Sequence, residues 1–81
     1  SPEFSHDMEL KFPGGRASVS VNVRKGIIQE VQLLSGQLDP EQIERFSQSL
    51  RGRPYSPGGV LSSGGELPDV RRAIAGEIQG S

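Results

Sequence analysis

The sequence predicts an α+β domain in which a three-stranded antiparallel meander precedes two helices (β-β-β-α-α) that pack on one face of the sheet. Residues 17–24 alternate between apolar and polar side chains, the pattern of a strand with one buried face. Glycine-containing turns flank this strand, so its neighbours fold back beside it. Asp39-Pro40 then begins a helix that can cover the buried face. With 81 residues the chain has room for one domain.

The first predicted strand spans residues 8–12, where apolar and charged side chains alternate. The segment 13–15, Pro-Gly-Gly, forms the turn into the strand at 17–24. Gly26 lies in the following turn, where it can adopt a positive φ. These features place three consecutive strands side by side.

The third predicted strand, residues 27–34, has apolar side chains on both faces. Ile27, Val31 and Leu33 share one face, whereas Ile28 and Leu34 share the other. A β-bulge that shifts the register would resolve this conflict, and so would a partly covered second face. Both explanations stay open at this point.

The first helix begins after Asp39, the predicted N-cap, with Pro40 at the first helical position and Gln42 at the capping-box position. An apolar stripe follows at helical spacing, and Gly52 is placed to end the helix in a left-handed conformation. The stripe consists of Ile43, Phe46 and Leu50.

Residues 56–65 are rich in glycine and serine and predict a flexible loop, anchored by Val60-Leu61 at its middle. A second helix opens near Pro68 and ends before Gly80. Its apolar face should dock on the sheet, with the arginine pair on the opposite, solvated face. The apolar face comprises Leu67, Val70, Ile74 and Ile78, and the pair is Arg71 and Arg72.

The leader, residues 1–7, resembles the remnant of a cloning vector and is predicted to be disordered, which leaves 8–81 as the domain. His6, the single histidine, is then expected to be a solvated surface residue without a ligand or catalytic role.

Composition excludes several function classes. Nine basic and ten acidic residues give a net charge of −1 and no footprint for nucleic acid. There is no cysteine, and no apolar run long enough to cross a membrane, so we expect a soluble chain. The residue set also cannot build a Ser/His/Asp or Cys/His constellation convincingly. We therefore expect no enzymatic activity, no bound metal and no cofactor for this chain alone.

A family resemblance rests on the order and spacing of several segments. They are 12–15 (Phe-Pro-Gly-Gly), 23–28 (Val-Arg-Lys-Gly-Ile-Ile), 38–39 (Leu-Asp) and 50–55 (Leu-Arg-Gly-Arg-Pro-Tyr). Together they resemble the small C-terminal accessory domain of lipoate-protein ligase A, in which a strand ends in Val-x-Lys-Gly-x-Ile and the first helix ends in Leu-x-Gly with a tyrosine beyond. The resemblance covers residues 8–55, and the Gly/Ser-rich segment departs from the family pattern.

The resemblance implies a supporting role. In the family, a large catalytic domain binds ATP, lipoate and Mg²⁺, forms lipoyl-adenylate in the cytoplasm and passes the lipoyl group to a lysine of an acceptor protein. The small domain packs against the catalytic domain, in the same chain or as a separate subunit, supports adenylation and moves for transfer. The family's lipoate signature and catalytic lysine are absent from this sequence, so no active-site residue carries over.

The expected partner is therefore a ligase catalytic domain. Contacts are expected from the residues Phe12, Arg16, Arg24, Lys25 and Tyr55. The two aromatic residues flank predicted elements and could instead belong to the core, and the basic residues could simply be solvated. The alternative function is an unrelated protein-interaction module that binds another chain through a sheet edge or a helix face.

Overall fold

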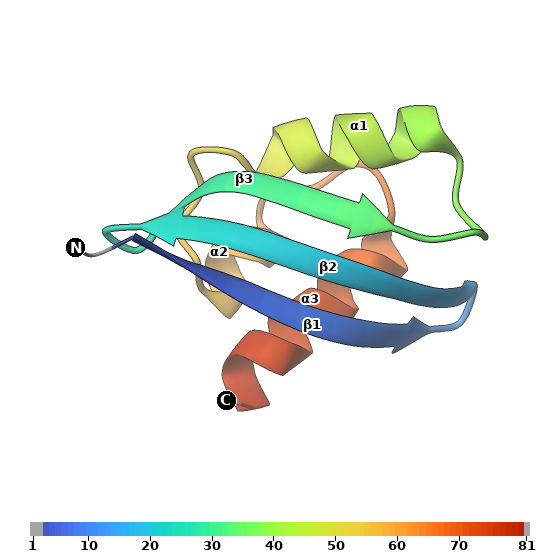
Figure 1. Ribbon diagram of the computed structural model, residues 1–81, viewed down its shortest axis with the longest axis horizontal. Coiled ribbons are helices and arrows are strands. Elements are labelled where there is room, and N and C mark those ends of the chain that lie inside the picture. Colours follow the sequence, from blue (N-terminus) through green and yellow to red (C-terminus); the bar gives the residue numbers. More distant parts are fainter. Residues whose placement is uncertain (1–2, 81) are drawn as a thin grey trace.

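The computed structural model describes residues 3–80 and contains one antiparallel sheet with the strand order β1-β2-β3. Three helices follow the strands, so the predicted α+β meander is confirmed (Figure 1). The elements are β1 (Glu3–Phe12), β2 (Gly15–Arg24), β3 (Ile27–Leu34), α1 (Pro40–Leu50), α2 (Pro57–Leu61) and α3 (Pro68–Gly80).

Strand β1 is longer than the sequence predicts. It pairs with β2 along its whole length, from Glu3 opposite Arg24 to Phe12 opposite Gly15. Residues 3–7 of the expected disordered leader are therefore part of the sheet, and that prediction is wrong for them; residues 1–2 lie outside the described residues. The physical reason is that β2 offers a full-length partner for their backbone groups.

A β-bulge resolves the conflict in β3. Asn22 lies opposite Glu30 but Val23 lies opposite Ile28, so Gln29 is the extra residue in the ladder. The shift turns Ile28 to the same face as Val31, which confirms the bulge explanation. The bulge also leaves the Gln29 carbonyl free to accept a hydrogen bond from Arg51 Nε at 3.2 Å.

Helix α1 starts as predicted, with an Asp39 carboxylate oxygen accepting from the Gln42 amide at 3.2 Å. The Gln42 side chain, however, donates to Glu66 at 3.4 Å rather than completing a capping box. At the other end Gly52 has the predicted left-handed conformation, with φ of 81°. Its amide donates to the Ile28 carbonyl of β3, so the helix end is joined to the sheet.

The Gly/Ser-rich segment 56–65 is only partly the loop that its composition predicts, because residues 57–61 form the short helix α2. Ser56 caps the short helix α2 by accepting from the Gly59 amide at 3.0 Å. Val60 is fully buried and anchors the segment as expected, whereas Leu61 is 48% exposed and anchors nothing. Arg53 adds hydrogen bonds to the Gly59 carbonyl and to a serine at the end of the helix. A local cap and one buried valine thus order the segment.

Helix α3 buries Val70 and Ile74 as predicted, but Arg71 does not lie on a solvated face. Only 3% of Arg71 is exposed, and its guanidinium lies 4.8 Å from the centre of the Phe46 ring. The helix contributes a broader buried face than its apolar residues indicate. A buried arginine is tolerated here because polar atoms surround its donors.

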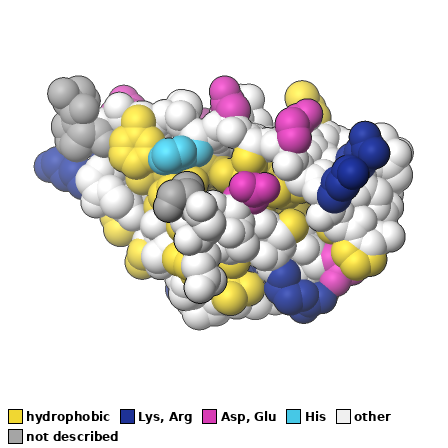
Figure 2. All heavy atoms as spheres, turned by 90° about the horizontal axis from the view of Figure 1, so that it is seen from below, with side chains coloured by type: hydrophobic (Ala, Val, Ile, Leu, Met, Phe, Trp, Pro, Cys, Tyr) yellow, Lys and Arg dark blue, Asp and Glu magenta, His cyan; other side chains and the backbone are white. Residues whose placement is uncertain are grey.

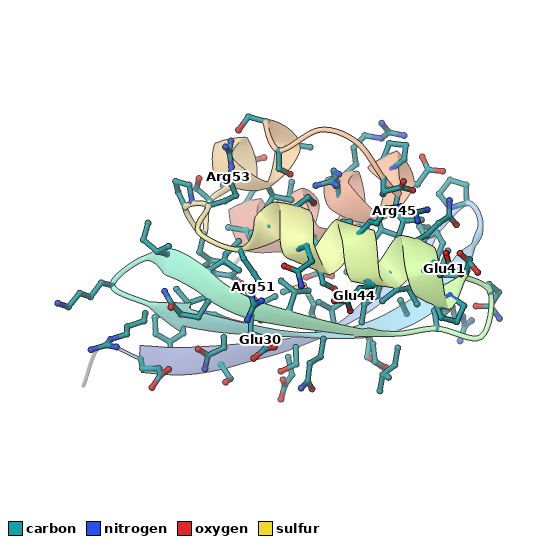
Figure 3. All side chains as sticks on the ribbon, turned by 90° about the horizontal axis from the view of Figure 1, so that it is seen from above. Glu30, Glu41, Glu44, Arg45, Arg51 and Arg53 are labelled. Carbon is teal, nitrogen blue, oxygen red and sulfur yellow. The ribbon has the colours of Figure 1, made fainter. Side chains whose placement is uncertain are left out.

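All three helices lie on one side of the sheet, as predicted, and the other side is open (Figure 3). Helix α1 packs on β3 and helix α3 packs on β1. The core between these layers contains Leu10, Val19, Val21, Val23, Ile28, Val31, Leu33, Phe46, Leu50, Val60, Val70 and Ile74.

Candidate partner interface

The residues expected to contact a partner lie at two opposite ends of the sheet. Phe12 and Arg16 flank the β1–β2 turn, whereas Arg24, Lys25 and Tyr55 lie at the β2–β3 turn. Strand β2 separates these ends, and at about 3.3 Å per residue it spans roughly 30 Å. The structure therefore does not bring the five residues together into one site.

At the β1–β2 end, Phe12 is partly buried and packs against the core. The Arg16 side chain is exposed, and its backbone amide donates to Gln37 Oε1 at 3.2 Å. The Arg16 carbonyl accepts from Ser35 Oγ at 2.7 Å. These contacts tie the end of β3 to the start of β2, so this end of the sheet is stabilised by local packing and hydrogen bonds.

The β2–β3 end is built by the segment that follows α1. The Ile28 amide donates to the Arg53 carbonyl and the Tyr55 amide donates to the Gly26 carbonyl, both at 2.8 Å. Pro54 forms an isolated bridge with Ile27. Residues 52–55 therefore run beside the start of β3 and hold Tyr55 next to the turn.

Tyr55 belongs to an aromatic cluster that the sequence analysis missed. Its ring stacks on His6 with centroids 4.8 Å apart and meets Phe4 edge-on at 6.5 Å. Phe4 and His6 also meet edge-on at 4.6 Å. Figure 2 shows the histidine beside hydrophobic side chains at the end of the molecule where β1 begins.

A signal for these residues exists in the sequence. Phe4 and His6 continue the alternation of Met8, Leu10 and Phe12, so all five point to the helix-covered side of a longer strand. Phe4 is 43% exposed although its ring contacts those of His6 and Tyr55.

Two basic residues lie at this end of the sheet, and the side chain of Arg24 is on the open face, opposite to Phe4 and His6. Arg24 lies opposite Glu3 at the end of β2, and Lys25 is the first residue of the turn. Both are exposed, and within residues 3–80 neither takes part in a salt bridge. Burial of the phenol raises the pKa of Tyr55 above its ordinary value.

The open face of the sheet is a second candidate surface. It carries a shallow hollow of about 270 Å³ over small polar side chains of β2, and Leu34 beside it is 73% exposed. Its rim is acidic and polar. The hollow is lined by Asp7, Glu9, Ser18, Ser20, Gln32 and Leu34, among others.

Within residues 3–80 there is no group of three or more His, Cys, Asp or Glu side chains placed to hold a metal ion. The strongest polar cluster surrounds Arg71, where burial lowers the pKa of the guanidinium and the Glu66 carboxylate opposes that shift. The Nε, Nη1 and Nη2 groups of Arg71 donate to protein oxygen atoms, so this cluster stabilises the fold.

Comparison with known proteins identifies the family. Residues 1–67 match the family described as the bacterial lipoate protein ligase C-terminus. The lipoate-protein ligase A of Psychrobacter cryohalolentis is 28% identical over 78 residues, which cover 96% of this chain and 23% of the relative. The lipoate-protein ligase A of Blochmanniella pennsylvanica is 28% identical over 61 residues, covering 75% of this chain and 18% of the relative. The chain thus spans about a fifth of the length of these relatives and belongs to the family of bacterial lipoate protein ligase C-terminal domains.

Proposed function

We propose that this chain is a non-catalytic accessory domain of a lipoate-protein ligase. It packs on the catalytic domain, in the same chain or as a separate subunit, supports ATP-dependent formation of lipoyl-adenylate and moves for lipoyl transfer. The observation that carries this proposal is the family match over residues 1–67 in a chain about one fifth as long as its relatives. The remaining four fifths of such a ligase are available for the chemistry.

The reacting groups belong to the catalytic partner in this proposal. ATP, lipoate and Mg²⁺ bind there, and lipoyl acceptor proteins are served only indirectly by the small domain. Acidic side chains of the small domain such as Glu41 and Glu44 lie exposed on α1, where ordinary solvated carboxylates do no acid–base work. The proposal places the domain in the cytoplasm beside its partner. No helix within residues 3–80 is long and apolar enough to cross a membrane.

The shape of the domain suits an accessory role. Its core is sealed between the sheet and the helices, while the open sheet face and both sheet ends remain accessible. A domain that docks and moves away needs a modest, partly polar interface instead of a large apolar one. The predicted contact residues Phe12, Arg16, Arg24, Lys25 and Tyr55 lie at the sheet ends and offer such surfaces.

A reconstitution assay tests the proposal. The chain is mixed with the catalytic part of a ligase from the same organism, from which the native small domain has been deleted. Pyrophosphate release from ATP and lipoate is then measured with increasing amounts of the chain. Saturable stimulation supports the accessory role, and absence of both binding and stimulation would overturn it. The chain alone should release no pyrophosphate.

The alternative function, an unrelated interaction module, is not supported by the comparison with known families. It required a chain outside the ligase family, whereas the family match covers residues 1–67. No described surface favours a different class of partner: the basic residues are few, and the hollow on the open face is shallow.

A further inference from the structure

We propose that the free edge of β1 binds β1 of a second copy of this chain, through antiparallel pairing of residues 8–12. This pairing joins the two sheets into one continuous sheet, with the helices of both copies on the same side. The inference does not rest on the proposed accessory function, because it depends on the geometry and the charges of β1. It uses residues of the domain and none of the leader, residues 1–7.

Strand β1 is the outermost strand of the sheet, because the strand order is β1-β2-β3 (Figure 1). Its register with β2 is continuous from Glu3 to Phe12, without the bulge that interrupts β3. Within the described part of the chain, residues 8–12 make no backbone hydrogen bond outside the sheet. Strand β1 therefore presents a regular row of backbone donors and acceptors to a further strand.

The opposite edge of the sheet is blocked where β3 begins. The Ile28 amide donates to the Arg53 carbonyl, and the Ile28 carbonyl accepts from the Gly52 amide. The bulge at Gln29 follows directly. Covering segments and bulges are common devices by which proteins protect a sheet edge from further pairing. The fold thus protects the start of one edge and leaves the edge of β1 open.

The charged side chains of β1 select one register. When the helices of both copies share one side, residues that lie opposite each other have their side chains on the same face. With Leu10 opposite its own copy, Glu9 lies opposite Lys11 of the second copy. Registers centred on Glu9, Lys11 or Asp7 place like charges opposite each other. The register centred on Met8 places Asp7 opposite Glu9. Like charges directly opposite are destabilising, so the register centred on Leu10 is favoured over these neighbours.

The pairing also supplies a missing counter-charge. Lys11 lies directly opposite Arg16 of β2, which is a destabilising pair of like charges. Within residues 3–80 neither of them takes part in a salt bridge, and neither does Glu9. In the paired sheet, Lys11 lies between Arg16 and the Glu9 carboxylate of the second copy. Attraction between the copies therefore offsets the repulsion within each one.

The helix-covered side of the paired strands is apolar. Leu10 is buried, and Met8 and Phe12 are partly buried against the core. The same register places Met8 opposite Phe12 of the second copy, and contacts between a thioether and an aromatic ring are favourable. The C-terminal end of α3 extends past β1 on this side, so an added strand lies over a helix (Figure 1). A second copy therefore adds apolar contacts on one side of the sheet and ion pairs on the other.

A second copy fits this edge better than an unrelated strand, because the edge is complementary to itself. Two-fold symmetry requires that each contact occurs twice, with the roles of the two copies exchanged. The segment Glu-Leu-Lys at residues 9–11 meets that condition. The pairing ends at Pro13, which has no amide hydrogen to donate. Pairing limited to residues 8–12 gives a small interface, so the association is weak and reversible.

Sedimentation of the chain at increasing concentration, up to about 1 mM because a small interface binds weakly, measures the self-association. We expect a reversible shift from one chain to two. Glu9→Lys and Lys11→Glu should each weaken the association about tenfold or more, since two attractive pairs become two repulsive ones. The double variant Glu9→Lys/Lys11→Glu should associate like the wild type. An equimolar mixture of the two single variants should also associate, because the substituted side chains then face opposite charges.

A matched control reverses a charge elsewhere on the sheet. Glu30→Lys changes an exposed residue of β3, away from the edge of β1, and should associate like the wild type. Thermal unfolding of each variant separates loss of pairing from loss of folding. If a single variant does not fold, the double variant decides, because restored association requires the exchanged ion pairs. Amide exchange at residues 8–12 should slow as the concentration of the wild-type chain rises.

Several outcomes would overturn the proposal. They are a wild-type chain that stays monomeric at every concentration, single variants that associate like the wild type, and a mixture or double variant that stays monomeric. Slower exchange in another element instead of residues 8–12 would also overturn it. If the wild-type chain stays monomeric and Glu9→Lys weakens its binding to the catalytic part of a ligase, that part occupies the edge and the second copy does not. The accessory function is tested separately by pyrophosphate release, so either proposal can fail while the other stands.

Discussion

Replacing the buried Arg71 by methionine should destabilise the domain strongly. Arg71 Nε donates to the Glu66 carbonyl and Arg71 Nη2 to Ser49 Oγ, both at 2.8 Å, and Nη1 donates to Ser63 Oγ. The guanidinium thereby joins α3, the loop before it and α1. Methionine retains an unbranched apolar stem of similar length but offers none of these donors.

The size of the effect follows from the bonds lost. Three intramolecular hydrogen bonds at a net value of about 1 kcal/mol each amount to about 3 kcal/mol. The Glu66 carbonyl is left without this donor, whereas the Ser49 and Ser63 hydroxyls still donate to backbone carbonyls. A domain of 81 residues is stable by roughly 4 to 12 kcal/mol, so the loss is a large fraction of the total. The melting temperature should fall by roughly 12 to 24 °C.

Urea and thermal unfolding followed by circular dichroism measure this change, and the neighbouring arginine provides the control. Arg72 is exposed, and its side chain pairs only with Asp69 in the same helix. Arg72→Met should therefore change stability by less than about 0.5 kcal/mol. Equal stabilities of the Arg71→Met and Arg72→Met variants would refute the role assigned to the buried guanidinium.

Three further predictions concern other parts of the fold. Gly59→Ala should lower the free energy of unfolding by about 1 to 3 kcal/mol, since a Cβ there would lie 2.1 Å from the Pro54 carbonyl oxygen. Gly58→Ala places a Cβ with nothing within 4 Å and should be neutral or slightly stabilising. Equal melting temperatures of the two variants would contradict this contrast. Asp39→Ala should lower the free energy of unfolding, measured with denaturant, by about 1 kcal/mol. Asp39→Asn should keep most of the wild-type stability, because an amide oxygen also caps the helix. Burial raises the pKa of Tyr55, so the unfolded chain ionises first and stability should fall as pH rises above about 10. Since Tyr55 is the single tyrosine, ultraviolet titration reports its pKa directly, and a midpoint at or below the ordinary value would contradict the burial.

Much of the fold was predictable because the relevant signals are local. The alternation in 17–24, the turn at Gly26 and the cap at Asp39 each involve residues close in sequence, and each is confirmed. The bulge was predictable as one of two options because Ile28 and Val31 could not otherwise share a face. The resemblance to the ligase family also depended on short motifs in order, and the family match confirms it.

Other features depended on contacts between distant residues and could not be read locally. Arg71 is polar, so periodicity placed it in solvent, but Ser49 from another helix supplies a partner that makes burial possible. The segment 56–65 has a loop-like composition, yet it is ordered through Val60 in the core. The aromatic cluster required Tyr55 to meet His6, 49 positions away in the sequence, as the stacked pair shows.

The amino-acid sequence by itself determined the three consecutive strands, the helices α1 and α3, and the ligase family, because patterning, turns and caps act over a few residues. Only the tertiary structure decided which of Phe12, Arg16, Arg24, Lys25 and Tyr55 can act together, since proximity across a sheet about 30 Å long depends on how strands and loops pack. It placed Tyr55 beside Phe4 and His6 and turned Arg24 to the open face of the sheet, and it left Phe12 and Arg16 at the far end.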